Sequence, residues 1–169
     1  MEKYTFSWNL IGDVNLGRPN LGLNMEVDVY RLMQYTLRDT VEKKLGTEET
    51  DKIFFNAGKL AGTHFFEHFL VPVETLEEMA SKLQRILKEK GIGILKIEEI
   101  NQETGEIFLT IDEDLDCSGL PVLNYETCIY DEGFIAGIFE SFTEREWNVK
   151  EIDCWCTGDR TCRFKAAQK

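Results

Sequence analysis

The C-terminal stretch from Thr127 to Phe164 constrains the fold of this chain most, because it contains four of the five cysteines. They are Cys128, Cys154, Cys156 and Cys162. The remainder of the sequence has an intracellular character, and in that setting a group of thiols marks a metal site more often than a disulfide framework. We therefore expect this stretch to close around a metal ion.

Two of these cysteines fall on a predicted β-hairpin. Residues 147–155 have the composition of a strand, and residues 157–159, Thr-Gly-Asp, favour a turn. A three-residue loop would place Cys154 opposite Cys162. Cross-strand neighbours have Cβ atoms about 4.5–5.5 Å apart, so both sulfurs could reach one tetrahedral ion.

Cys128 begins a separate stretch with helical spacing of its apolar residues. Gly133 and Gly137 lie four residues apart in it, which suits a helix packed closely on a neighbour. A thiolate from this helix would join helix and sheet through the metal.

The fourth ligand is open on pattern alone. Strand alternation puts Cys156 on the same face as Cys154, whereas Glu151 would need a β-bulge to turn toward the metal. Alternation therefore favours Cys156.

The segment resembles the end of the 4-vinyl-reductase-like domain. This small-molecule-binding module is also the sensor domain of phenol- and xylene-responsive bacterial activators. The likeness lies in C-x-Y-x-x-G-F-x-x-G at residues 128–137 and E-x-x-C-x-x-x-G-D-x-x-C-R-F at residues 151–164.

The resemblance implies a zinc ion held by three cysteines and a glutamate. Carried over position by position, these metal ligands are Cys128, Glu151, Cys154 and Cys162, and Cys156 becomes a neighbour. Such a closed shell leaves no open position for water, so the zinc is expected to be structural. Cys117 is expected to be a spectator.

Charge and length narrow the class of protein. The 169 residues suit one domain, and 19 basic against 31 acidic residues give a net charge of −12, which argues against nucleic acid as a partner. Neither an apolar run long enough to cross a membrane nor a secretory signal is recognisable. We expect a cytoplasmic protein with no membrane partner.

We expect an α+β fold in which helices pack on an antiparallel sheet of about four strands, with the C-terminal hairpin carrying the zinc site. Residues 1–24 are expected to form an N-terminal arm, extended or a short hairpin rather than a helix, and residues 25–169 a single zinc-containing ligand-binding domain. Further helices are predicted over 25–45, 48–69 and 75–91, and strands over 92–100 and 106–112.

Three motifs point to other functions less strongly. His64 and His68 with Glu67 match the H-x-x-E-H of inverted metalloproteases, but the flanking phenylalanines indicate a buried helix. Residues 112–116 begin like a calcium loop but lack its later glycine and glutamate, so we expect a solvated acidic turn. No G-x-G-x-x-G follows a strand, so nicotinamide binding is not indicated.

The resemblance implies a pocket between helices and sheet for an aromatic or other hydrophobic small molecule, and a homodimer. A non-enzymatic binding or sensor domain is therefore expected. Two alternatives remain: an enzyme or accessory subunit of tetrapyrrole vinyl-group reduction, and a non-catalytic interaction scaffold resembling subunits of trafficking complexes.

Overall fold

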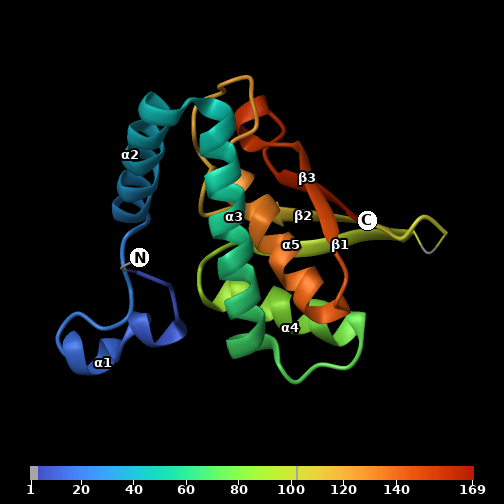
Figure 1. The fold of residues 1–169 in the computed structure, drawn as a ribbon, viewed down its shortest axis with the longest axis horizontal. Helices are drawn as coiled ribbons and strands as arrows, with labels where there is room; N and C mark the ends of the chain where they lie inside the picture. The colour runs from blue at the N-terminus through green and yellow to red at the C-terminus, as the bar shows by residue number, and fades with distance from the viewer. Residues whose placement is uncertain (1–3, 102) are drawn as a thin grey trace. The chain divides into compact units, whose positions relative to one another are not determined.

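The structure is a computed structural model that describes residues 4–101 and 103–169 (Figure 1). It divides into two compact units, one ending at Thr40 and one beginning at Val41. The second unit holds all five cysteines. The fold is α+β, as predicted, with five helices and one four-stranded antiparallel sheet among the described residues.

The sheet is built from two antiparallel pairs. Strands β1 (Ile94–Asn101) and β2 (Glu106–Asp112) form one pair, and β3 (Trp147–Asp153) and β4 (Cys162–Gln168) form the other. Their spatial order is β1-β2-β4-β3, and each neighbouring pair is antiparallel. The alternation of apolar and polar residues predicted β2 with its observed bounds, because one face of this strand lies in the core.

Helices α3 (Thr47–Phe65) and α5 (Ile129–Thr143) lie side by side (Figure 1). A Cβ atom built at Gly58 would lie 2.0 Å from the carbonyl oxygen of Tyr130, and one at Gly133 equally close to that of Phe55. No real Cβ tolerates such a distance, so these glycines allow the two backbones to touch. Gly62 and Gly137 serve the same contact.

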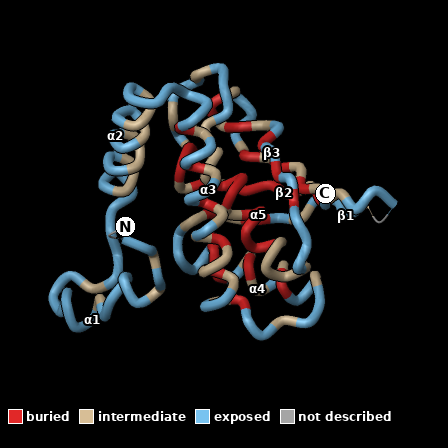
Figure 2. The backbone as a smooth tube through the Cα atoms, viewed as in Figure 1, coloured by how far each residue is buried: buried red, intermediate tan, exposed pale blue. Residues whose placement is uncertain are grey.

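A short π-helical turn, η2 (Phe66–Leu70), continues α3, and α4 (Leu76–Glu89) follows. The Thr75 side chain caps α4 by accepting a hydrogen bond from the Glu78 N–H at 3.2 Å. The helix buries its predicted inward face, Met79, Leu83, Ile86 and Leu87. Figure 2 shows buried backbone concentrated on α5, the sheet and the adjoining parts of α3 and α4.

The N-terminal unit differs from its prediction in one respect. The described residues 4–24 contain a 3-10 turn, η1 (Trp8–Ile11), and one α-helical turn, α1 (Val14–Gly17), instead of a hairpin. Asp13 starts the helical turn because its carboxylate accepts the Leu16 N–H at 2.9 Å. Helix α2 (Val27–Leu45) then covers nearly the predicted range. Within the described ranges, no helix combines the length and hydrophobicity needed to span a bilayer.

Candidate metal centre and ligand cavity

Four buried thiols meet where the loop after β2, the start of α5, the end of β3 and the start of β4 come together. They belong to Cys117, Cys128, Cys154 and Cys162, and their sulfurs all lie within 4.8 Å of one another. We call them the thiol cluster. Each of the four is 0% exposed.

The spacing of the sulfurs suits a tetrahedral metal ion. Cys128 Sγ lies 3.9 Å from Cys154 Sγ and 3.6 Å from Cys162 Sγ, and Cys117 Sγ lies 3.0 Å from Cys162 Sγ. Sulfurs around a zinc ion with Zn–S bonds near 2.3 Å are about 3.8 Å apart, so small shifts would convert the cluster into a ligand set. Thiolates are ligands that zinc prefers.

A β-bulge brings Glu151 to the same side as Cys154. Strand β3 buries alternate residues down to Glu151, which is 2% exposed, and its register with β4 shifts between Glu151 and Asp153. This is the irregularity that the sequence required for Glu151 to turn inward. Glu151 Oε2 accepts the Cys128 N–H at 3.1 Å, whereas its Oε1 is buried without a hydrogen-bond partner. An unpartnered buried carboxylate oxygen beside thiols also fits a cation site.

Cys156 lies next to the thiol cluster, outside the group of four. It sits in a 3-10 turn, η3 (Trp155–Thr157), and its N–H donates to Cys154 Sγ at 3.4 Å. Strand β3 ends before this turn because the Thr157 hydroxyl accepts the Cys154 N–H at 3.1 Å and donates to the Cys154 carbonyl at 2.8 Å. The strand therefore stops short of the predicted end at residue 155, and the alternation argument for Cys156 does not apply.

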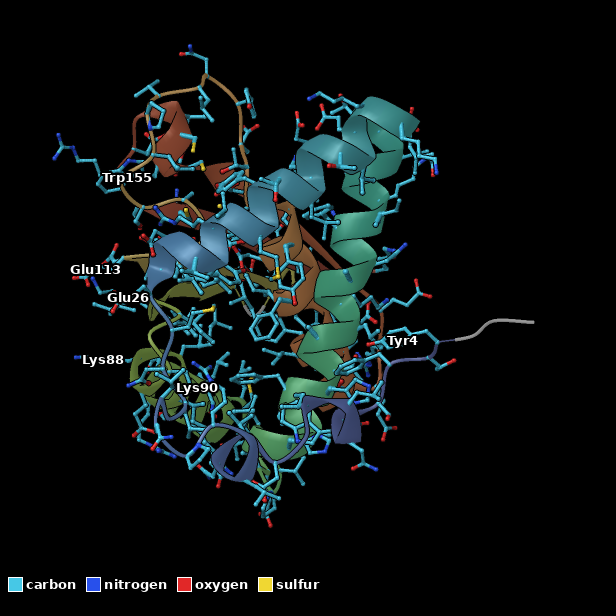
Figure 3. The ribbon with its side chains drawn as sticks, turned by 90° about the vertical axis from the view of Figure 1, so that its left-hand side faces the viewer. Tyr4, Glu26, Lys88, Lys90, Glu113 and Trp155 are labelled. Carbon is cyan, nitrogen blue, oxygen red and sulfur yellow. The ribbon has the colours of Figure 1, made fainter. Side chains whose placement is uncertain are left out.

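Trp155 fastens the turn to the rest of the site. Its indole N–H donates to the carbonyl oxygen of Leu120 at 2.9 Å, which ties η3 to the loop between β2 and α5. Figure 3 shows sulfur atoms, in yellow, in the part of the molecule where Trp155 is labelled. The thiols thus lie beneath a covered turn.

Cys117 is the member of the thiol cluster that the sequence analysis left out. It is positioned by Asp114, whose Oδ1 accepts the N–H groups of Asp116 at 2.8 Å and Cys117 at 3.1 Å. Asp114 and Asp116 are 3% and 5% exposed, so the expectation of a solvated acidic turn is wrong for these two residues. The turn folds inward because its carboxylates bind its own backbone, and no spacing rule links Cys117 to the other cysteines.

The surroundings of the thiol cluster are strongly acidic. Burial, together with the nearby Asp116, raises the pKa of Asp114 to about 7. Burial and the Cys154 sulfur raise the pKa of Glu151 to about 8. Burial also raises the pKa of Asp131 well above its ordinary value, with Asp116 and Asp114 adding to the effect. Buried acids that gather in this way favour a cation among them.

Hydrogen bonds among the thiols single out one sulfur as the anion. Hydrogen bonds from Cys117, Cys128 and Cys162 hold the pKa of Cys154 far below its ordinary value. The same contacts raise the pKa of Cys128. Cys154 is therefore the thiolate that a metal would meet first, since the thiolate is the metal-binding form.

A second group of potential metal ligands consists of His64, Glu67 and His68. All three lie on one stretch where α3 passes into the π-helical turn. Glu67 and His68 are exposed, and His68 Nδ1 lies 2.8 Å from the His64 carbonyl oxygen. One histidine thus contacts its own helix, as expected for a polar group satisfied by the backbone.

A small cavity lies in the core of the second unit between α4, α5 and the sheet. Its volume is about 20 Å³. Apolar side chains line it: Met79, Leu83 and Leu87 from α4, Leu95, Leu109 and Ile111 from the sheet, and Ile135, Ile138 and Phe139 from α5, among others. Among the described residues, Asp131 is the one polar member of the lining.

Asp131 also connects this cavity with the thiol cluster. Ligand atoms of Asp114, Cys128 and Asp131 lie within 4.8 Å of one another. The cavity and the candidate metal centre therefore share a wall at the start of α5.

Sequence comparison places the C-terminal part of the chain in a known family. Residues 107–168, which contain all five cysteines, match the family model of the vinyl-4-reductase domain. An uncharacterized protein of Methanocaldococcus jannaschii is 24% identical over 145 residues, which cover 86% of this chain and 79% of that protein. Another from the same organism is 30% identical over 114 residues, which cover 68% of this chain and 62% of that protein.

Two solved structures share the fold. A vinyl-4-reductase family protein of Methanocaldococcus jannaschii aligns with a TM-score of 0.65 and 15% identity over 100% of this chain and 99% of that one. The phenol-responsive sensory domain of the transcription activator PoxR, solved with phenol, aligns with a TM-score of 0.65 and 14% identity over 86% of this chain and 76% of that one. The resemblance read from the cysteine motifs is confirmed, and residues 107–168 of this chain are a vinyl-4-reductase domain.

Proposed function

We propose that this protein is a zinc-stabilised module that binds a small hydrophobic or aromatic molecule. The observation that carries the proposal is the apolar cavity that shares a wall with the thiol cluster. A ligand there would contact α4, α5 and the sheet together, so its presence could be felt by every layer of the domain.

The metal part of the proposal rests on the donor set. Cys128, Cys154 and Cys162 are the cysteines assigned by the family resemblance, and their sulfurs are already together. Glu151 and Cys117 both adjoin them, and we propose that these two share the role of fourth ligand. When bound, zinc would cross-link helix, loop and hairpin, and its binding energy would add to the stability of the fold.

The ligand part of the proposal draws on PoxR, whose sensory domain was solved with phenol. The present cavity has room for about one water-sized molecule, so a larger ligand must displace lining side chains. Met79 can give way most easily, because its unbranched side chain adopts many shapes.

Two further parts of the proposal follow from the family resemblance. The protein acts as a homodimer, and it acts in the cytoplasm as a binding or sensor domain without catalysis of its own. Its net charge of −12 supports partners other than nucleic acid.

Native mass spectrometry of protein purified without added ligand tests these parts together. We expect a dimer mass with one zinc ion per chain and an additional small apolar molecule. A chelator-treated sample serves as the control for the metal mass. A metal-free monomer that retains nothing, and that takes up no added aromatic compound, would contradict the proposal.

A further inference from the structure

The carboxyl group of Asp131 lies in surroundings that nothing in the architecture of the domain explains. Asp131 is 8% exposed, and its Oδ2 is buried without a hydrogen-bond partner. A buried polar atom without a partner costs free energy, so proteins rarely keep one that serves no purpose. The described lining of the cavity is otherwise apolar, so the carboxyl group stands alone there.

The position of Asp131 on α5 aims it at the cavity. Residues 131, 135 and 138 follow helical spacing along one face of the helix, and Asp131, Ile135 and Ile138 all line the cavity. The carboxyl group therefore forms the polar end of an apolar compartment.

A trapped water molecule does not account for this arrangement. Buried waters make about three hydrogen bonds to protein groups, and among the described side chains this lining offers only the carboxyl group of Asp131. A ligand with a single polar head and an apolar body matches the lining better, because the head would meet the carboxyl group and the body would meet the aliphatic walls.

We propose that Asp131 is the specificity-determining residue of the cavity, and that the ligand is a small apolar molecule carrying one hydrogen-bond-donating head, a hydroxyl or an amino group. This inference rests on the proposed binding function and adds the chemistry of the head group. Hydrocarbons of the same shape bind more weakly than the head-bearing ligand, because they leave the carboxyl oxygen unpartnered.

Three probes of nearly equal shape test the inference: ethylbenzene, benzyl alcohol and benzylamine. Their dissociation constants are measured by calorimetry or ligand-observed NMR with zinc-loaded wild-type protein and with the Asp131→Leu variant. We expect Asp131→Leu to weaken benzyl alcohol or benzylamine by about tenfold, the effect of leaving the polar head without its buried partner. Ethylbenzene should bind the variant as well as it binds the wild type, or better.

Two matched variants separate recognition from general damage. Asp131→Asn keeps a hydrogen-bond acceptor and should retain the preference for benzyl alcohol over ethylbenzene. Asp114→Asn changes a buried acid beside the same cysteine but outside the cavity lining, and it should leave the ratio of the two dissociation constants unchanged. Asp131→Leu should melt at or above the wild-type temperature, because it removes a buried oxygen without a partner.

The outcomes distinguish the inference from the proposed function. If no probe binds the wild-type protein, the proposed function itself fails. If the probes bind but Asp131→Leu leaves their relative affinities unchanged, the binding function stands and the role of Asp131 is overturned. The role is equally overturned if the wild-type protein binds ethylbenzene as tightly as both head-bearing probes, a result that does not depend on whether Asp131→Leu folds.

Discussion

The thiol cluster and the histidine turn at His64, Glu67 and His68 both bring metal-ligating atoms within 4.8 Å, but they do so by different means. The histidine turn needs only the helical repeat, so its residues are neighbours whether or not the rest of the chain folds. The thiol cluster needs two loops, the start of α5 and both arms of the last hairpin in place at once. A metal ion in the thiol cluster would therefore report on the tertiary fold, and one at the histidine turn would report only on a local helix.

Burial separates the two sites in the same direction. The four thiols are inaccessible to solvent, whereas Glu67 and His68 are exposed. Buried acids surround the thiols, so a cation there would also offset charge that water cannot reach. The difference indicates that only the thiol cluster can couple metal binding strongly to stability.

The largest effect expected from this contrast is that of Cys162→Ser. The variant should lose stoichiometric zinc and several kcal/mol of unfolding free energy, because binding energy at a structural site is folding energy. Zinc content and denaturant unfolding measure the two losses. A variant that binds zinc and unfolds like the wild type would remove the distinction between the two sites.

The fourth ligand is tested by Cys117→Ser and Glu151→Gln. We expect each single change to weaken zinc binding by about 10–100-fold, because the other residue remains to complete the shell. The double variant should lose stoichiometric zinc. Competition with a chromogenic chelator gives the affinities, and a double variant that still holds one zinc ion at wild-type affinity would exclude both residues.

Cys156→Ser should have a smaller effect. Its sulfur lies 3.4 Å from the Thr127 hydroxyl, outside the thiol cluster, so zinc should remain stoichiometric. A loss of about 1 kcal/mol in unfolding free energy is expected, since a buried thiol is replaced by a more polar hydroxyl. Loss of the metal from this variant alone would instead make Cys156 a ligand.

The smallest effect is expected from His68→Ala. Because His68 is exposed and its ring contacts the backbone of its own helix, zinc content should be unchanged and the unfolding free energy should fall by less than about 1 kcal/mol. Zinc analysis beside Cys162→Ser, prepared in parallel, provides the comparison. Reduced zinc in His68→Ala would place a metal at the histidine turn.

Much of the architecture could be predicted from local sequence patterns. The alternation in 106–112 predicted β2, and the apolar spacing around Leu83 predicted the buried face of α4. The paired glycines predicted the close contact of α5 with a neighbouring helix, because only a residue without a side chain permits that distance. These features depend on neighbours in the sequence or on a single steric requirement.

The site was harder to predict because it depends on loops. Cys117 reaches the thiols through a turn held by Asp114, and the end of β3 is set by hydrogen bonds between Cys154 and Thr157. Neither follows from periodicity. The lone carboxyl group of Asp131 in an apolar cavity also became visible only in three dimensions, since the sequence shows it merely as an acidic residue in the first turn of a helix.

X-ray absorption spectroscopy of the zinc-loaded wild-type protein tests the central claim most directly, because it identifies the atoms bound to the metal. The account predicts one zinc ion per chain with at least three sulfur neighbours at about 2.3 Å. A shell made only of nitrogen and oxygen, or protein that takes up no zinc when folded and reduced, would contradict it.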